Sequence, residues 1–517
     1  MSNAEPAFVP VKYRGLITVS VMAAMIMQIL DTTIANVALP HMQSSLGAAQ
    51  DTITWVLTSY IVAAAIATPI TGWLADNIGR KRLFLICVGG FVAASALCGT
   101  AFSLEEMVVF RVLQGIFGAA LAPLSQSVIM DINPFERRGQ AMAVWAAGIM
   151  VAPILGPTLG AWLTEDFSWR WCFYINLPVG LLAAAGIFFF MPETIKRIRR
   201  FDFFGFGLLA IAIGAVQLML DRGEQVDWFQ SAEIFIELGL FVAGLWMFIV
   251  HTATARDPFL DPGLFRDRNF SVALTFIFII GIILLATMAL LPPMLQSLFG
   301  YPVTTVGLIL APRGIGTMIS MIVVGRLVQR VDPRLLVLIG LALTAYSLWQ
   351  MTEYSLEMNE WPIIISGVIQ GFGLGFVFIP LTTVAFVTLP SHLRTDATSL
   401  FNLVRNLGSS IGISIMAAML TRNIQTNHAA LAGHITLFNP NLTTAGIDPT
   451  TFATPEGVET AMQVNNMINV QSAMIAYLND FIVMFWITLA AAPLLFLLRY
   501  RPTPVQPKRP PVAVIAD

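Results

Sequence analysis

Long apolar segments recur along nearly the whole chain, and they fix the environment in which it folds. A helix of about 20 apolar residues crosses the hydrocarbon core of a bilayer, where every backbone polar group must be satisfied within the protein. Hydrophobic residues make up 57% of the 517 residues and charged residues 11%, whereas soluble domains carry about a quarter charged residues. The sequence therefore predicts an all-α integral membrane protein.

Hydropathy predicts fourteen spans. An arrangement of twelve, without the seventh and the eighth, keeps the same parity and stays open, because Glu233 and Glu237 lie near the start of the eighth. The first apolar run is longer than that of a signal peptide, so it is predicted to be a span. The predicted ranges are 15–38, 52–74, 83–101, 107–129, 140–163, 169–190, 203–221, 232–250, 270–291, 304–325, 335–352, 361–388, 397–420 and 479–498.

The distribution of Lys and Arg predicts the topology. If the N-terminus is cytoplasmic, the cytoplasmic segments hold 22 of the 28 Lys and Arg residues, and the outer loops hold 3. The positive-inside rule favours this orientation, with both termini in the cytoplasm. The other three, Arg111, Arg313 and Arg405, lie inside predicted spans.

The chain contains an internal repeat. VLQG ending at Gly115 recurs as VIQG ending at Gly371, and three further features recur at offsets of 253 to 257 residues. A single short match arises easily by chance, but four agreeing offsets favour two homologous six-helix bundles with two extra helices between them. In transporters built from parallel repeats, the substrate path lies between the halves. The predicted units are a cytoplasmic segment 1–14, a bundle 15–190, linker helices with cytoplasmic loops 191–269, a bundle 270–498 and a cytoplasmic tail 499–517.

The segment 421–478 departs from the repeat, because apolar sequence resumes about 50 residues later than the offset requires. It is rich in Asn, Thr, Gln and Met and is predicted to lie outside the membrane. Its end, 461–477, has the character of a polar helix that extends the last span outward. A solvated loop and a docking surface for an outer partner both fit this composition.

Asp31 is the one acid that we place deep inside a span, against three arginines. It shares a helix face with Gln28 and Ala35, so a polar stripe faces either a cavity or a neighbouring helix. Charged groups at this depth are costly and mark ion pathways, and desolvation favours the neutral carboxyl. We therefore expect Asp31 to take up and release a proton. The alternative is a structural aspartate locked to an arginine.

Arg111 shares its face with Gly115 and Gly118, small residues that let a neighbouring helix approach while the guanidinium reaches a cavity or Asp31. Arg405 lies near the GxxxG pair of Gly408 and Gly412. Arg313 follows a proline, and it could equally snorkel to an interface. The side chains expected to line a substrate cavity are Gln28, Gln114, Arg313, Gln370, Asn402 and Arg405.

The fifth span carries small residues four apart, which give one smooth face, and two prolines, which remove two helix hydrogen bonds. This pattern predicts a bendable helix packed closely against a partner; simple close packing is the alternative. The residues concerned are Gly148, Ala152, Pro153, Gly156, Pro157 and Gly160.

A short charged loop follows the second span. Gly72, Asp76, Gly79 and Arg80 lie in GWLADNIGRKRL, where Asp76 could pair with Arg80 or cap a facing helix. In the second half the position of Asp76 is Gln329, so one copy alone can make a charged latch.

Several chemistries lack support in the sequence. There is no phosphate-binding GxxxxGK[ST], and the His and Cys residues have no metal-ligand or catalytic spacing. A formal charge of −2 argues against a nucleic-acid partner. We therefore expect no enzyme activity, no metal and no cofactor, with the proton gradient as the energy source.

Several motifs together resemble the major facilitator superfamily, in particular its fourteen-helix drug:proton antiporters of the EmrB/QacA type. LMLDRGEQVDWF (218–229) is similar to the EmrB group. The other motifs are LDTTIANVALP (30–40), GWLADNIGRKRL (72–83), RVLQGIFGAA (from 111), the Gly/Pro pattern of 148–161 and WRWCFYINLPVG (from 169).

The resemblance implies proton-driven export of lipophilic drugs by alternating access from the bacterial inner membrane. It implies a proton-coupling role for Arg111, a direction-setting role for the fifth-span pattern, and a gating latch at Asp76 and Arg80. It also implies a periplasmic membrane-fusion adaptor and an outer-membrane channel as partners. From the balance of charges in the spans we further expect neutral or weakly acidic lipophilic substrates. The alternatives are a proton-coupled solute importer of the same fold and a non-transporting receptor or assembly scaffold.

Overall fold

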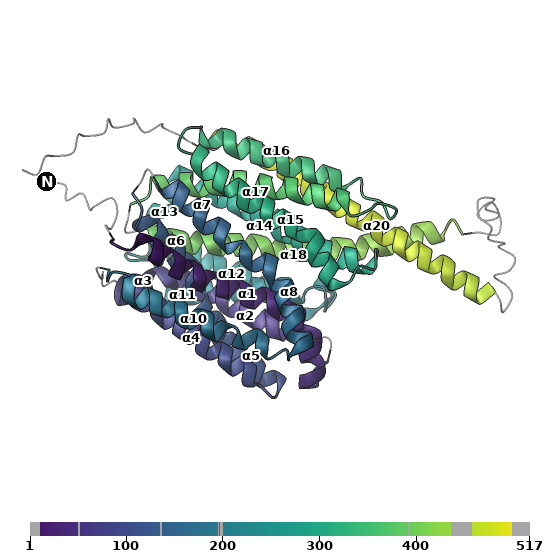
Figure 1. Cartoon of the computed structure of the whole chain (residues 1–517), viewed down its shortest axis with the longest axis horizontal. Coiled ribbons are helices and arrows are strands. Elements are labelled where there is room, and N and C mark those ends of the chain that lie inside the picture. The colour runs from purple at the N-terminus through teal and green to yellow at the C-terminus, as the bar shows by residue number, and fades with distance from the viewer. Residues whose placement is uncertain are drawn as a thin grey trace, which may run out of the picture.

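The computed structural model describes residues 11–49, 52–134, 137–194, 196, 200–390, 393–435 and 457–498. Within them, 14 helical segments are long and apolar enough to cross a membrane. The first six form one bundle and the last six another, drawn purple to blue and green to yellow in Figure 1. The prediction of an all-α membrane fold with fourteen spans is confirmed.

The N-terminal bundle begins with α1 (Arg14–Leu46). Its second span consists of α2 (Trp55–Ala67), η1 (Thr68–Ile70) and α3 (Thr71–Ile78), and its third is α4 (Arg80–Thr100). The fourth span is divided into α5 (Leu104–Gly118) and α6 (Leu121–Asp131), and the fifth into α7 (Arg138–Ile149) and α8 (Val151–Asp166). The short α9 (Trp171–Tyr174) leads into α10 (Asn176–Phe190).

The linker helices are α11 (Phe203–Arg222) and α12 (Ala232–Thr254), so the twelve-span alternative is wrong. The C-terminal bundle follows the short α13 (Gly263–Arg266) and consists of α14 (Arg268–Ser297), α15 (Val303–Leu327), α16 (Pro333–Met351), α17 (Trp361–Val387), α18 (Arg394–Ala432) and α20 (Gly457–Ala491), which η6 (Ala492–Leu497) continues.

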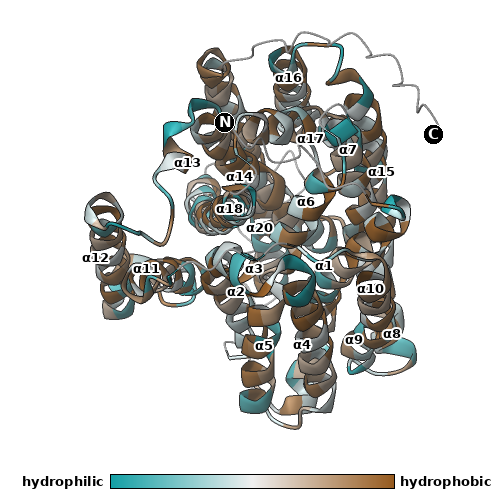
Figure 2. Ribbon diagram, turned by 90° about the vertical axis from the view of Figure 1, so that its left-hand side faces the viewer, coloured by the Kyte–Doolittle hydropathy of each residue, from teal (hydrophilic) through white to brown (hydrophobic). Residues whose placement is uncertain are grey.

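The two linker helices stand together at the side of the bundles (Figure 2). One polar side-chain contact joins them near each end: His251 Nε2 lies 2.8 Å from an oxygen of Asp202, and Arg222 Nε lies 2.8 Å from an oxygen of Glu233. Burial raises the pKa of Asp202, but hydrogen bonds from the N–H groups of Gly205 and Phe259 and from His251 outweigh it, and the pKa lies below its usual value.

The last two long helices extend further than predicted. The loop predicted at 421–478 is wrong at its start, because α18 continues to Ala432. At its end, α20 begins at Gly457, a few residues before the expected polar helix. The expected polar helix at 461–477 is confirmed as part of α20, which projects beyond the bundles in Figure 1. The two extensions pair through polar side chains: His428 Nε2 lies 3.0 Å from Asn465 Oδ1. Residues 436–456 and the tail 499–517 lie outside the described residues.

Both bundles use the same neighbour relations, as two copies of one repeat should. In the first, α5 packs on α2 and α4, and α1 packs on α8 and α10; in the second, α17 packs on α15 and α16, and α14 packs on α18 and α20. The repeated glycines mark equivalent contacts, since Gly115 lies against the backbone of α2 and Gly371 against that of α15.

The contact between α14 and α18 depends on glycine. A Cβ at Gly412 would lie 2.6 Å from Ile282 Cα, a distance that real Cβ atoms essentially never show. Small residues allow such close backbone approach between membrane helices.

We predict that Gly412→Val lowers the stability of the C-terminal bundle by about 1–3 kcal/mol, because the added methyl groups must push α14 away. Thermal unfolding of purified protein in detergent measures the change. Gly207→Val in α11 is the matched control, because a Cβ there meets nothing within 4 Å. Equal melting temperatures for the two variants would contradict the packing argument.

Candidate functional site

An ion pair lies inside the N-terminal bundle. Arg111 Nη1 donates to Asp31 Oδ2 at 2.7 Å, and both side chains are 1% exposed. The other carboxylate oxygen accepts hydrogen bonds from Gln114 Nε2 at 2.8 Å and from Asn176 Nδ2 at 2.7 Å. The Asp31 carboxyl group thus has a guanidinium and two amide donors around it, which satisfy both of its oxygens.

Surrounding groups hold the members of this site in place. Arg111 Nε donates to the carbonyl of Val56 at 3.0 Å, and its guanidinium lies 4.4 Å from the centre of the Tyr60 ring. Asn176 also donates to Ser95 Oγ at 2.9 Å. Buried charges are tolerated when their remaining hydrogen-bonding capacity is satisfied in this way.

The two charges come from different helices of one bundle. Asp31 lies on α1 and Arg111 on α5, and the amides come from α5 and α10. The sequence left open whether the polar stripe of the first span faces a cavity or a neighbouring helix. In the structure, Asp31 faces neighbouring helices. Half-buried Gln28, three residues before it, has a buried side-chain oxygen without a hydrogen-bond partner among the described residues.

The fifth span connects this region with the other bundle. Gly148, Gly156 and Gly160 face α1, where they meet Met22, Thr33 and Ile34. On its other side, Ile154 lies against Gly314 of α15. The helix is interrupted at Met150, between α7 and α8, and Pro157 lies within α8. An interrupted helix between Asp31 and the opposite bundle is suited to transmit movement between them.

Ion pairs join the two bundles at the end of the molecule where Arg80 lies. Asp131, at the end of α6, binds Arg80 of its own bundle and Arg394 of the other, the second at 2.9 Å. Gly72 lies against Asp396 so closely that a side chain would not fit between α3 and α18. Gly79 has a positive φ of 94°, which allows the sharp turn from α3 into α4.

Polar contacts continue this interface towards the centre of the molecule. Asn402 Nδ2 donates to Gln126 Oε1 at 3.0 Å, and Thr398 Oγ1 donates to the Pro123 carbonyl at 3.3 Å. The halves are therefore joined at the end that the positive-inside rule places in the cytoplasm.

The other side chains expected around a substrate cavity are more deeply placed. Gln114 and Gln370 are 0% exposed, and Gln114 forms hydrogen bonds with both members of the Asp31–Arg111 ion pair. Arg313 is 7% exposed, and its guanidinium donates weakly to the Leu284 carbonyl at 3.4 Å. Arg405 is half-buried, with Asn406 Oδ1 3.5 Å away.

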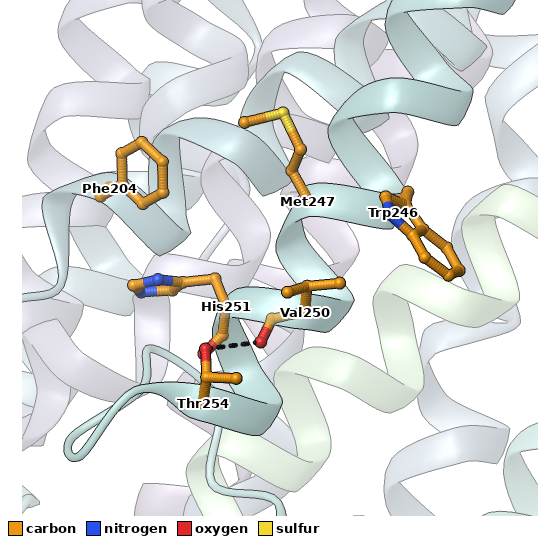
Figure 3. A pocket seen from close by; sticks show the side chains of 6 residues that line it. All are labelled: Phe204, Trp246, Met247, Val250, His251 and Thr254. Carbon is orange, nitrogen blue, oxygen red and sulfur yellow. Dashed lines mark hydrogen bonds between the residues drawn. The ribbon is translucent and has the colours of Figure 1, made fainter.

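A groove of about 270 Å³ lies on the linker helices, remote from these residues in the sequence (Figure 3). Its lining comes from α11 and α12 and consists of Phe204, Trp246, Met247, Val250, His251 and Thr254. Trp246 is 69% exposed. The groove is therefore part of the outer surface of the linker helices.

Comparisons with known proteins agree with this architecture. A family model described as "Major Facilitator Superfamily" matches residues 21–413. The chain is 38% identical over 447 residues to "Multidrug export protein EmrB" of Haemophilus influenzae, covering 85% of this chain and 87% of that protein. It is 39% identical over 429 residues to "Fatty acid resistance protein FarB" of Neisseria gonorrhoeae, covering 82% and 84%.

The solved structure of the human organic anion transporter MFSD10 superimposes with a TM-score of 0.59 at 15% identity, covering 92% of this chain and 100% of that one. This likeness concerns the fold. The chain therefore belongs to the major facilitator superfamily, and within it to the transporters of the EmrB type.

Some members of the site were not predicted from the sequence. Asp131 was not singled out by any sequence pattern, Arg394 counted only among the cytoplasmic charges, and Asn176 lies within a motif that supported the resemblance alone. The recurrence of VxQG pointed to Gln114 and Gln370 without giving their partners. No local signal identifies these contacts, because Asp131 and Arg394 are 263 residues apart.

We predict that Asp131→Asn shifts the protein towards a state open at this end. Arg80 and Arg394 would lose their shared charge partner, and hydrogen bonds to charged groups contribute about 1.5–3 kcal/mol. The expected shift in the conformational equilibrium is roughly ten- to a hundredfold, measurable as the labelling rate of single cysteines placed on α6 and α18.

Glu193→Gln is the matched control for this measurement. The pair of Arg82 and Glu193 is 3.6 Å long with both side chains more than half exposed, and such surface pairs contribute little. Unchanged labelling in Asp131→Asn would exclude the charged contact as a determinant of closure.

Proposed function

We propose that this chain is a proton-driven exporter of lipophilic drugs that works by alternating access in the bacterial inner membrane. The observation that carries the proposal is the Asp31–Arg111 ion pair, buried in a chain 38% identical to a multidrug export protein over 85% of its length. The family consists of transporters, which speaks against the receptor or scaffold alternative. Export rather than import is supported by the named activity of the EmrB relative.

Proton coupling is assigned to Asp31 and Arg111. A proton on Asp31 removes the charge that holds Arg111, and the guanidinium must then find other partners. α8 packs on α1 through Gly156 and Gly160 and reaches α15 with its other side. Rearrangement around the Asp31 carboxyl group is therefore transmitted through α8 to the contact between the bundles. α8 belongs to the fifth span, whose motif the resemblance associates with antiport.

Gating is assigned to Gly72, Asp76, Gly79 and Arg80, together with Asp131 of α6. With both termini in the cytoplasm, these residues form the inner gate. Its ion pairs must separate before a substrate enters from the cytoplasmic side.

The proposed substrates are neutral or weakly acidic lipophiles. Arg111 is neutralised by Asp31, whereas Arg313 and Arg405 form no ion pair among the described residues. A guanidinium attracts a carboxylate or phenolate and repels a dication. The FarB relative is named for fatty acid resistance, which fits an acidic amphiphile.

The proposed partners are a periplasmic membrane-fusion adaptor and an outer-membrane channel. The extensions of α18 and α20 project beyond the bundles (Figure 1) and expose apolar side chains, including Met462 and Met467. They provide a surface outside the membrane on which an adaptor would dock.

We predict that Asp31→Asn abolishes drug-driven proton flux. In everted vesicles, an exporter dissipates a preformed ΔpH when drug is added. The variant must first be shown to fold, because Arg111 would keep the Val56 carbonyl and Gln114 but lose its counter-charge. Wild-type flux in folded Asp31→Asn would remove Asp31 from the mechanism.

We also predict that expression protects cells against uncoupler-like phenols and fatty acids but not against dicationic biocides. Arg405→Gln should reduce protection against acidic compounds more than against neutral ones, since it removes a cation. Arg422→Gln is the control, because Arg422 is an exposed residue of the same helix. Robust efflux of dications without protection against acidic lipophiles would contradict the substrate class.

A further inference from the structure

Asp480 is a further acid buried within a span, so the expectation that Asp31 is the one acid deep inside a span is wrong. Asp480 lies on α20, inside the 458–497 span, and is 0% exposed. The sequence placed it at the very start of the last span, because the polar residues before it lower the local hydropathy. By the helix rise of 1.5 Å per residue, Asp480 lies about 25 Å from Leu497 and Asp31 about 25 Å from Arg14. Each acid therefore lies well inside its own candidate span.

The surroundings of Asp480 differ in kind from those of Asp31. Neither of its carboxyl oxygens has a hydrogen-bond partner among the described residues, and it forms no ion pair there. It shares the buried face of α20 with Met484 and Thr488. An ionised carboxylate without a cation or donor is far more costly to bury than a neutral carboxyl group.

Charged groups on the neighbouring helices do not compensate it. α20 packs on α14, α16 and α18. Tyr477 lies one turn before it, and the ring of Tyr354 lies 6.0 Å from that of Phe481, the residue after Asp480. Arg313 contacts the Leu284 carbonyl instead, and Arg405 of α18 lies beside Asn406.

The internal repeat explains why the C-terminal bundle has a different acid. At an offset of 256 residues, Thr287 corresponds to Asp31 and Gln370 to Gln114. The hydrogen bond is retained, because Gln370 Nε2 lies 3.3 Å from Thr287 Oγ1. Gly367 stands where the first bundle has Arg111, so the ion pair is lost. Thr287 Oγ1 also reaches the sulfur of Met484, one turn from Asp480, at 3.7 Å.

We propose that Asp480 is a second proton-binding site of the transporter, which holds its proton while the gate at Asp131 is closed. The proposal rests on proton-driven transport as proposed above. α18, which carries Arg394 of the gate, packs directly on α20. Opening the gate moves α18, changes the packing around Asp480 and admits water, which favours loss of the proton. Two carboxyls, one in each bundle, then take part in one transport cycle: Asp31, which is paired with Arg111, and Asp480, which has no hydrogen-bond partner among the described residues.

Infrared spectroscopy of the full-length protein tests the protonation directly and does not depend on transport. At neutral pH, the difference between wild type and Asp480→Asn should contain the carbonyl band of a protonated carboxyl group, with a shift in heavy water. Asp31→Asn should leave that band in place, because the band is assigned to the Asp480 carboxyl group. A wild-type spectrum identical to that of Asp480→Asn in this region would overturn the proposal.

Proton release on drug binding tests the coupling. In weakly buffered solution, Asp480→Asn should release fewer protons per bound drug, by up to about one per protein. Ser472→Ala is the matched control, since Ser472 is a buried residue of the same helix with an unpartnered hydroxyl. Equal release in wild type and Asp480→Asn would overturn the coupling role, whereas absence of drug-driven flux in wild type would instead refute the proposed function.

Discussion

A charge inside a membrane protein must be paired, neutralised or led to water, and this requirement organises the interior of the chain. Asp31 and Arg111 meet it by pairing, with both side chains 1% exposed and with amide donors on the second carboxylate oxygen. The pair draws together three helices of the N-terminal bundle. Breaking it leaves a buried cation without its partner, so any change in the protonation of Asp31 must be answered by movement of its surroundings.

Movement at this position has a route to the other bundle. The glycine face of α8 lies on α1, and its opposite side reaches α15. At one end of the molecule, Asp131 binds an arginine from each bundle. The fifth span therefore contacts both regions: its second part, α8, packs on α1, which carries Asp31, and its first part, α7, packs on α6, which ends at Asp131.

The two bundles share their helix packing but differ in where they carry charge. The retained hydrogen bond between Gln370 and Thr287 is the counterpart of the bond between Gln114 and Asp31. Equivalent helices pack on one another in both bundles, because such packing depends on helix shape and on small residues. The ionisable group is not shared, because Thr287 stands in the second bundle where Asp31 stands in the first. Among the described residues of the C-terminal bundle, the buried acid whose oxygens have no hydrogen-bond partner is Asp480, on the last helix.

Hydropathy and periodicity were sufficient for the membrane location and for the burial of Asp31 and Arg111, because these are local properties of a chain that must satisfy its backbone in lipid. They left twelve spans open as an alternative to fourteen, and the folded structure decided for fourteen. The glycine face of the fifth span was likewise readable, though its partner α1 was not. The pairing of Asp131 with Arg394 and the burial of Asp480 came from the folded arrangement alone. Residues 263 positions apart meet only when two bundles pack, and a polar stretch is buried or exposed according to the neighbour that covers it.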